Sequence, residues 1–118
     1  MKPKLRDIEI ADIVLHLGRQ PRILIVDDEK PITKMLECAF SGVGYDVVAL
    51  QCSNTAGNHI ASRARKGVGH DVVISDYDNK YASGDYEGGM TLYRRLQREG
   101  VVPALYIVIS SYDTVPIP

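Results

Sequence analysis

The sequence predicts an α/β domain built on a parallel sheet with helices on both of its faces. Three apolar runs that each end in polar residues indicate buried strands at residues 23–26, 72–75 and 104–109. These runs are apolar throughout rather than alternating, which is typical of strands buried on both sides of a parallel sheet. Segments with helical spacing lie between the strands, and this alternation favours right-handed crossovers that place helices on both faces.

The first strand is followed by a helix and a second strand. Pro31 suits the first turn of a helix, and the apolar residues after it recur at the spacing of one buried helical face. That face comprises Ile32, Met35, Leu36, Ala39 and Phe40. Gly42 and Gly44 end this helix, and the Val-rich segment 45–50 is expected to form the next strand.

Two further helices alternate with the remaining strands. The Ser-Asn-Thr sequence at 53–55 is expected to cap a weakly apolar helix that ends before Gly67, as suits a half-exposed outer element. The central strand, 71–75, comes next, and a third helix is expected over 90–98. The residues of that helix that should face inward are Leu92, Tyr93 and Leu96.

An additional amphipathic helix is expected ahead of the sheet, within residues 1–20, where Gly18 closes the helical pattern. Its apolar stripe consists of Ile10, Ile13, Val14 and Leu17. Such a stripe must be buried, so we expect the helix to cover sheet surface or to pair with its copy in a homodimer. The chain thus divides into an N-terminal extension, 1–20, and a domain of residues 21–118.

Length and charge exclude several classes of function. The chain has 118 residues, a size that suits one domain, with 14 Lys plus Arg against 15 Asp plus Glu. This balance provides no basic excess for binding nucleic acid or an anionic membrane. No apolar stretch reaches the roughly 20 residues of a membrane span and no secretory signal is visible, so a cytoplasmic location is expected. Cys38 and Cys52 lack the spacing of a metal site; both are expected to be reduced, and Cys38 to be buried.

Acids and hydroxyls collect where the predicted strands end. Asp27 and Asp28 follow the first strand, Asp76 follows the third, and Ser110 and Ser111 follow the fourth. Because the carboxyl ends of parallel strands lie along one edge, where such sheets bind ligands, we expect these side chains to converge. Clustered carboxylates repel one another unless a divalent cation neutralises them, and oxygen-rich sites suit Mg²⁺. The pattern therefore predicts a site for Mg²⁺ and phosphate.

The string Ile-Leu-Ile-Val-Asp-Asp-Glu-Lys-Pro at 23–31, together with strands that end at Asp76 and Ser110, resembles the receiver domain of two-component response regulators. The resemblance covers about residues 22–113 and implies a flavodoxin-like (CheY-like), doubly wound sheet. It also implies a phosphorelay function, in which a histidine kinase or phosphotransfer protein passes a phosphoryl group to an aspartate beside Mg²⁺. A downstream protein partner would read the result. Beyond phosphorylating and dephosphorylating itself, the chain is not expected to be an enzyme.

The family's motif implies a role for each candidate site residue. Asp76 would be the phosphoacceptor and would also contact the metal. Asp28 would ligate the metal directly, and Asp27 would act through water or a hydrogen bond. The backbone carbonyl of Asp78 would supply a further metal ligand. Ser110 would provide the hydroxyl that turns toward the phosphate.

Three features depart from the family pattern. The loop after Asp76 is longer and carries three tyrosines before Gly89, the matching glycine, so it either covers the site, binds a partner or is a solvated insertion. The sequence stops at Pro118, so about four strands are expected, without the family's fifth strand, its lysine and its fifth helix. The N-terminal helix is extra, and Lys2, which precedes a proline, is one candidate to replace the missing lysine.

Two other functions remain open from the sequence. A pseudo-receiver scaffold would keep the fold and the acids but act by protein binding, without an acyl phosphate and with binding unchanged in Asp76→Asn. A phosphatase of the haloacid dehalogenase type would use Asp76 and Asp78 as its Asp-x-Asp motif, although no cap domain and no later acidic pair follow. Turnover of p-nitrophenyl phosphate would identify the hydrolase, and brief labelling by acetyl phosphate would identify the receiver.

Overall fold

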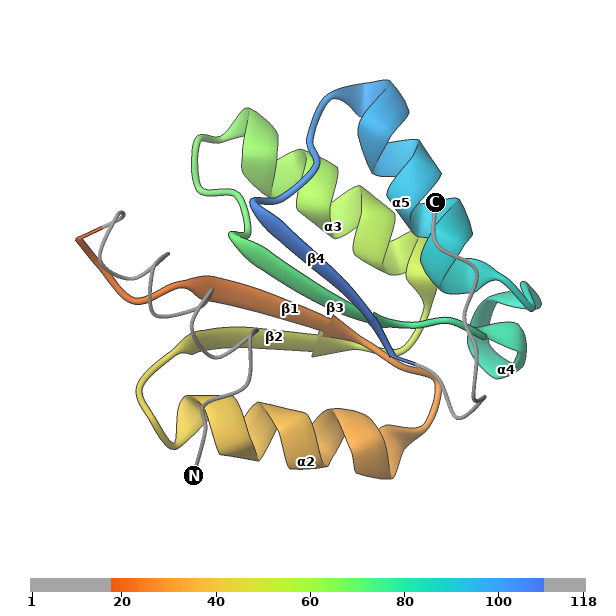
Figure 1. The fold of residues 1–118 in the computed structure, drawn as a ribbon, viewed down its shortest axis with the longest axis horizontal. Helices are drawn as coiled ribbons and strands as arrows, with labels where there is room; N and C mark the ends of the chain where they lie inside the picture. Colours follow the sequence, from red (N-terminus) through yellow and green to blue (C-terminus); the bar gives the residue numbers. More distant parts are fainter. Residues whose placement is uncertain (1–17, 110–118) are drawn as a thin grey trace, which may run out of the picture.

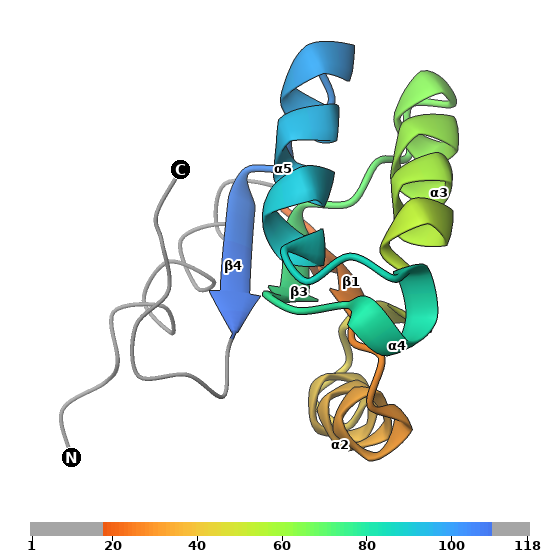
Figure 2. The same ribbon diagram turned by 90° about the vertical axis from the view of Figure 1, so that its right-hand side faces the viewer.

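A computed structural model of the chain describes residues 18–109, which form a four-stranded sheet with helices on both faces (Figure 1 and Figure 2). The strands are β1 (Arg22–Val26), β2 (Asp46–Leu50), β3 (Val72–Asp76) and β4 (Leu105–Ile109). The helices are α2 (Lys30–Ser41), α3 (Ser53–Arg65), the short α4 (Lys80–Ser83) and α5 (Gly88–Glu99). The predicted alternation of strands and helices is confirmed, and only α4 was not expected.

The sheet is parallel throughout, in the strand order β2-β1-β3-β4. This is the flavodoxin-like order, which begins 2-1-3-4. Val26 of β1 pairs with Ser75 of β3, so the residues that follow them, Asp27 and Asp76, lie next to each other at the same edge of the sheet. The chain proceeds outward from β1 to β2 on one side and from β3 to β4 on the other. The crevice between the carboxyl ends of β1 and β3 is where such sheets bind ligands.

Two apolar layers enclose the sheet, because alternate side chains of its strands point to opposite faces. Helices α3 and α5 cover one face, and α2 covers the other (Figure 1). The first layer contains Leu24, Val26, Ala56, Ile60, Val73, Leu92 and Leu96. The second contains Ile23, Ile25, Val72 and Ile74, against which Leu36 and Phe40 of α2 pack. Strand β1 is therefore buried on both sides, as its continuous apolar run predicts.

Helix α2 is less buried than its apolar periodicity predicts. Leu36 and Phe40 contact the sheet, but the Met35 side chain is 58% exposed, and Ala39 and Cys38 are also exposed. The prediction of a buried Cys38 is therefore wrong. Helical spacing correctly predicted which side of α2 faces the sheet, but it predicted more buried residues than the structure has. Helix α2 packs mainly against β2 and β1, which cover only part of that side.

Helix α3 begins without the local cap that its sequence predicts. Cys52 occupies the N-cap position, and no side chain there accepts a hydrogen bond from the first turn. The backbone N–H of Ser53 instead donates to Oδ1 of Asn79 (3.0 Å), and the Ser53 hydroxyl donates to the Ser83 hydroxyl (3.2 Å). The acceptor for this helix end is thus supplied by the loop after β3, and the predicted Ser-Asn-Thr cap is wrong.

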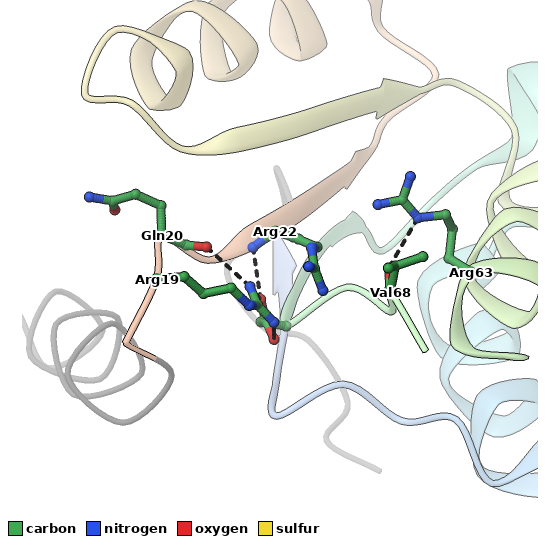
Figure 3. Close-up of polar contacts among 6 residues, drawn as sticks. Arg19, Gln20, Arg22, Arg63 and Val68 are labelled. Atoms are coloured by element: carbon green, nitrogen blue, oxygen red, sulfur yellow. Dashed lines mark hydrogen bonds and ion pairs between the residues drawn. The ribbon is translucent and has the colours of Figure 1, made fainter. Parts of the chain in front are cut away.

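Asp71 joins two segments at the edge of the sheet where the strands begin, opposite the edge that carries Asp27 and Asp76. The Arg19 guanidinium donates to both carboxylate oxygens of Asp71 (2.8 and 3.2 Å), and the Arg22 N–H donates to the same group (2.8 Å; Figure 3). Nearby, Arg63 Nε donates to the carbonyl of Val68 (3.0 Å). Burial raises the pKa of Asp71, but the bonds from Arg19 and Arg22 outweigh it and hold the pKa below its ordinary value.

Several predictions concern residues outside the described range. The N-terminal helix, Lys2, Ser110 and the segment in which a fifth strand was judged missing all lie there, and these predictions stay predictions. Within residues 18–109, none of the helices has the length and apolar composition that a membrane span requires.

Candidate metal and phosphate site

Three carboxylates from two strand ends meet in the crevice between β1 and β3. Asp27 and Asp28 directly follow β1, and Asp76 is the last residue of β3. One oxygen of each side chain lies within 4.8 Å of the corresponding oxygen of the others. Asp27 is 6% exposed and Asp76 is 7% exposed, while Asp28 is half-buried. The fold thus brings together, in a partly dehydrated site, three acids that the sequence singled out.

Backbone N–H groups orient these carboxylates. Oδ1 of Asp27 accepts a hydrogen bond from the Glu29 N–H (2.9 Å), and the Asp28 N–H donates to Oδ2 of Asp76 (3.3 Å). Oδ2 of Asp28 accepts a bond from the Tyr81 N–H (3.0 Å), which comes from the loop after β3. Bonds from neutral donors to ionised acceptors are stronger than neutral pairs, so they fix the positions of the oxygens.

Without a cation, it is electrostatically unfavourable for all three acids of the site to be ionised together. Burial and the nearby charge of Asp27 raise the pKa of Asp76 to about 7, although hydrogen bonds from Asp28 and Asn79 offset part of the increase. Burial also raises the pKa of Asp27 above its ordinary value. Without a cation, Asp76 is therefore partly protonated at neutral pH. A bound cation would favour the ionised form of every acid in the cluster.

An open cavity of ≈ 430 Å³ lies over the three carboxylates. Its walls are formed by Asp27, Asp28, Glu29, Ile32, Asp76, Tyr77, Asp78, Lys80, Tyr81 and Ile109. Lys80 is the one cation among these described residues, and its ammonium group lies 4.8 Å from the ring centroid of Tyr81. The cavity has room for a phosphoryl group, and the three carboxylates that line it favour a cation.

Two further predicted site residues are not part of the carboxylate cluster. Asp78, whose backbone carbonyl was the predicted ligand, lines the cavity, and its side-chain Oδ1 accepts a hydrogen bond from the Lys80 N–H (2.9 Å), which closes a local turn. Ser110 lies outside the described residues, although Ile109, which precedes it, also lines the cavity. The roles assigned to both stay predictions.

The long loop after Asp76 is folded against the site. It contains the helical turn α4 and an antiparallel bridge between Asn79 and Asp85. Where the loop ends, a Cβ on Gly89 would meet the backbone carbonyl of Asp76, so this close approach requires glycine. The loop thus forms one wall of the cavity, and its Tyr81 ring remains largely exposed to solvent.

Sequence reasoning missed the importance of Asn79. This residue is 0% exposed, and its Nδ2 donates toward both oxygens of Asp76, at 3.3 and 3.5 Å. An asparagine in a polar, tyrosine-rich loop has the composition of an ordinary turn, so no local pattern distinguishes it. Its position three residues after Asp76 was the only available signal.

Comparison with known proteins supports the fold. No protein-family model matches the chain, and no curated protein matches it. Among solved structures, the N-terminal domain of an uncharacterized protein from Wolinella succinogenes superposes with a TM-score of 0.63 and 22% identity. That match covers 80% of this chain and 67% of the other. Together with the strand order, it settles the architecture.

The chain has the flavodoxin-like fold. A second match, to the N-terminal receiver domain of NtrC, has a TM-score of 0.43 and 19% identity and covers 77% of this chain and 83% of that one. In this chain the carboxyl ends of β1 and β3 carry the acids described above. The fold class predicted from the sequence is therefore confirmed.

Proposed function

We propose that this receiver-like domain accepts a phosphoryl group on Asp76 in a Mg²⁺-dependent phosphorelay. The single observation that carries the proposal is the convergence of the Asp27, Asp28 and Asp76 carboxylates beneath an open cavity. The donor would be a histidine kinase or phosphotransfer protein in the cytoplasm, and a downstream protein partner would read the phosphorylated state. The domain would signal rather than turn over a substrate.

The donor set suits Mg²⁺. This ion prefers octahedral oxygen ligands at about 2.1 Å, which places neighbouring ligand oxygens about 3 Å apart and opposite ones about 4 Å apart. The three carboxylate oxygens, within 4.8 Å of one another, are close to that arrangement. Asp28 and Asp76 would ligate the ion directly, Asp27 through water or a hydrogen bond, and the Asp78 carbonyl would complete the protein's ligands. Mg²⁺ bound there would neutralise charge on the carboxylates and on the phosphoryl oxygens.

The chemical step is a displacement at phosphorus by one oxygen of Asp76. As the new O–P bond forms, the P–N bond of a donor phosphohistidine breaks, and its electron pair returns to the imidazole. Asp76 must be ionised to attack, and its raised pKa leaves it partly protonated near pH 7 without a cation. The Asp28 N–H bond to Oδ2 helps to orient the attacking group. Ser110 would then respond to the new phosphate.

Labelling by acetyl phosphate tests the proposal. Wild type should gain the mass of one phosphoryl group in the presence of Mg²⁺ and lose it slowly, whereas Asp76→Asn should gain none. Asp46→Asn is the matched control, because Asp46 is an exposed acid at the start of β2, at the opposite edge of the sheet. Equal labelling of wild type and Asp76→Asn would refute the assignment of Asp76.

One observation favours a pseudo-receiver scaffold as the second candidate. The carboxylates already have protein donors, because the Tyr81 N–H bonds to Asp28 and the Asn79 amide contacts Asp76. A site satisfied in this way does not require a phosphoryl group to be stable. The scaffold predicts no acyl phosphate from any donor, together with partner binding that is unchanged in Asp76→Asn.

A further inference from the structure

The Asn79 side chain connects the proposed phosphoacceptor to the start of α3. Its Nδ2 donates to the backbone carbonyl of Gln51 (2.8 Å) and toward the Asp76 carboxylate (3.3 Å to Oδ1), while its Oδ1 accepts from the Ser53 N–H (3.0 Å). The orientation of the amide is determined by its partners, because a backbone N–H can only donate and a carbonyl can only accept. One buried side chain thus contacts three separate backbone or side-chain groups.

The bond to Ser53 supplies an acceptor that α3 otherwise lacks. The first turn of a helix has N–H groups without intrahelical partners, and α3 has no side-chain cap of its own. The same turn is connected to α4 through the Ser53 and Ser83 hydroxyls, and the Ser83 hydroxyl donates to the Asn79 carbonyl (3.0 Å).

Packing leaves Asn79 little freedom to move as a whole. It is 0% exposed, and a Cβ added to Gly88 would approach the Asn79 Cβ to 2.5 Å, which shows how closely the start of α5 lies against it. Its backbone N–H is also bonded to the Asp85 carbonyl (2.9 Å). A packed side chain thus connects Asp76 to the backbone groups of Gln51 and Ser53.

We propose that Asn79 is a positioning residue that holds the Asp76 carboxylate and transmits a change in its charge to the first turn of α3. Hydrogen bonds to an ionised acceptor are roughly twice as strong as neutral ones. Loss of the negative charge at Asp76 weakens the Nδ2 bond and alters the amide that caps Ser53. The signalling use of this connection rests on the proposed function, but the connection itself exists whether or not Asp76 is phosphorylated.

Two charge-neutralising substitutions test the connection by the ¹H–¹⁵N NMR signal of the Ser53 amide. The spectra are recorded at pH 8, above the pKa of about 7 of Asp76, where its carboxylate is mostly ionised in wild type and in Asp28→Asn. There Asp76→Asn removes the charge that Asn79 contacts, whereas Asp28→Asn removes a charge in the same cavity that bonds to Tyr81 instead. We expect the Ser53 signal to shift in Asp76→Asn and to stay close to its wild-type position in Asp28→Asn. In an Asn79→Ala background, adding Asp76→Asn should no longer shift it.

Each outcome decides the inference independently of phosphorylation. Equal Ser53 shifts in Asp76→Asn and Asp28→Asn, or a shift that persists in the Asn79→Ala background, would overturn it. Should Asn79→Ala fail to fold, the comparison of the two single substitutions still decides the question. Failure of the phosphorelay proposal would be recognised separately, as the absence of added mass after treatment with acetyl phosphate and Mg²⁺.

Discussion

Replacing Asp76 with asparagine should stabilise the fold at neutral pH and leave it little changed in acid. Burial and the charge of Asp27 raise the pKa of Asp76 from 3.8 to about 7. Between pH 3.8 and about 7 this acid is ionised in the unfolded chain but protonated in the folded one, so folding takes up a proton and the free energy of unfolding decreases as the pH rises. Asparagine does not titrate, so the substitution removes this source of pH dependence.

The size of the effect follows from the pKa difference. A difference of one in pKa corresponds to about 1.4 kcal/mol, so the whole difference corresponds to about 4 kcal/mol. Between pH 5 and pH 8 the contribution of Asp76 is about 3 kcal/mol, a large fraction of the stability of a small domain. Part of the decrease in the free energy of unfolding with rising pH should persist in Asp76→Asn, because burial also raises the pKa of Asp27.

Urea unfolding followed by circular dichroism measures this difference directly. The experiment is performed with EDTA at several pH values from 5 to 8, on wild type, Asp76→Asn and the exposed control Asp46→Asn. We expect the free energy of unfolding to fall with pH in wild type and in the control, and to fall much less in Asp76→Asn. Parallel curves for all three proteins would refute the electrostatic reasoning.

Three further predictions test the metal site, the loop and the opposite edge of the sheet. Mg²⁺ at a hundred times its dissociation constant should stabilise wild type at pH 8 by about 2.7 kcal/mol, with most of this gain lost in Asp28→Asn, as measured by the melting temperature. Gly89→Ala should destabilise by about 1–3 kcal/mol in urea, because its methyl group would meet the Asp76 carbonyl; stability equal to wild type would contradict this close approach. Arg19→Ala should cost about 1 kcal/mol near pH 7 through loss of its ion pair with Asp71. That cost should shrink as the pH falls and Asp71 is protonated, because a lowered pKa contributes stability only above it; a cost independent of pH in urea titrations would argue against the pair.

The strands and the convergence of the acids were predictable because their causes are local and repetitive. A strand buried on both sides must be apolar at every position, and Ile23 to Val26 show this pattern directly. The carboxyl ends of parallel strands share an edge, so Asp27 and Asp76 had to emerge near each other once the order of the strands was known. The sequence supplied the apolar pattern directly, and the order of the strands came from the structure.

The cap of α3 and the burial of α2 could not be predicted, because they depend on distant residues. The Ser53 N–H finds its acceptor on Asn79, 26 residues further along the chain, and nothing near either residue indicates the pairing. Periodicity identifies the face of α2 but not how much of that face the sheet covers, which is why Cys38 and Met35 are exposed. Long-range packing decided both features.

The loop after Asp76 shows the same division between local and distant causes. Gly89 could be assigned from its place in the motif, and the contact with the Asp76 carbonyl explains why glycine is needed there. The bridge between Asn79 and Asp85 and the turn of α4 were not visible in a polar segment rich in Tyr, Asp and Gly. Such composition is equally typical of solvated loops.

Paramagnetic broadening by Mn²⁺ tests most directly whether one divalent cation binds where the strand ends converge. In ¹H–¹⁵N spectra at low Mn²⁺ concentration, the amides of residues 27–28 and 76–78 should broaden first and together, and Mg²⁺ should reverse the effect by competition. Asp76→Asn should abolish this selective pattern. Broadening spread over exposed acids such as Asp46 and Glu99, or a pattern unchanged by Asp76→Asn, would contradict a shared cation site.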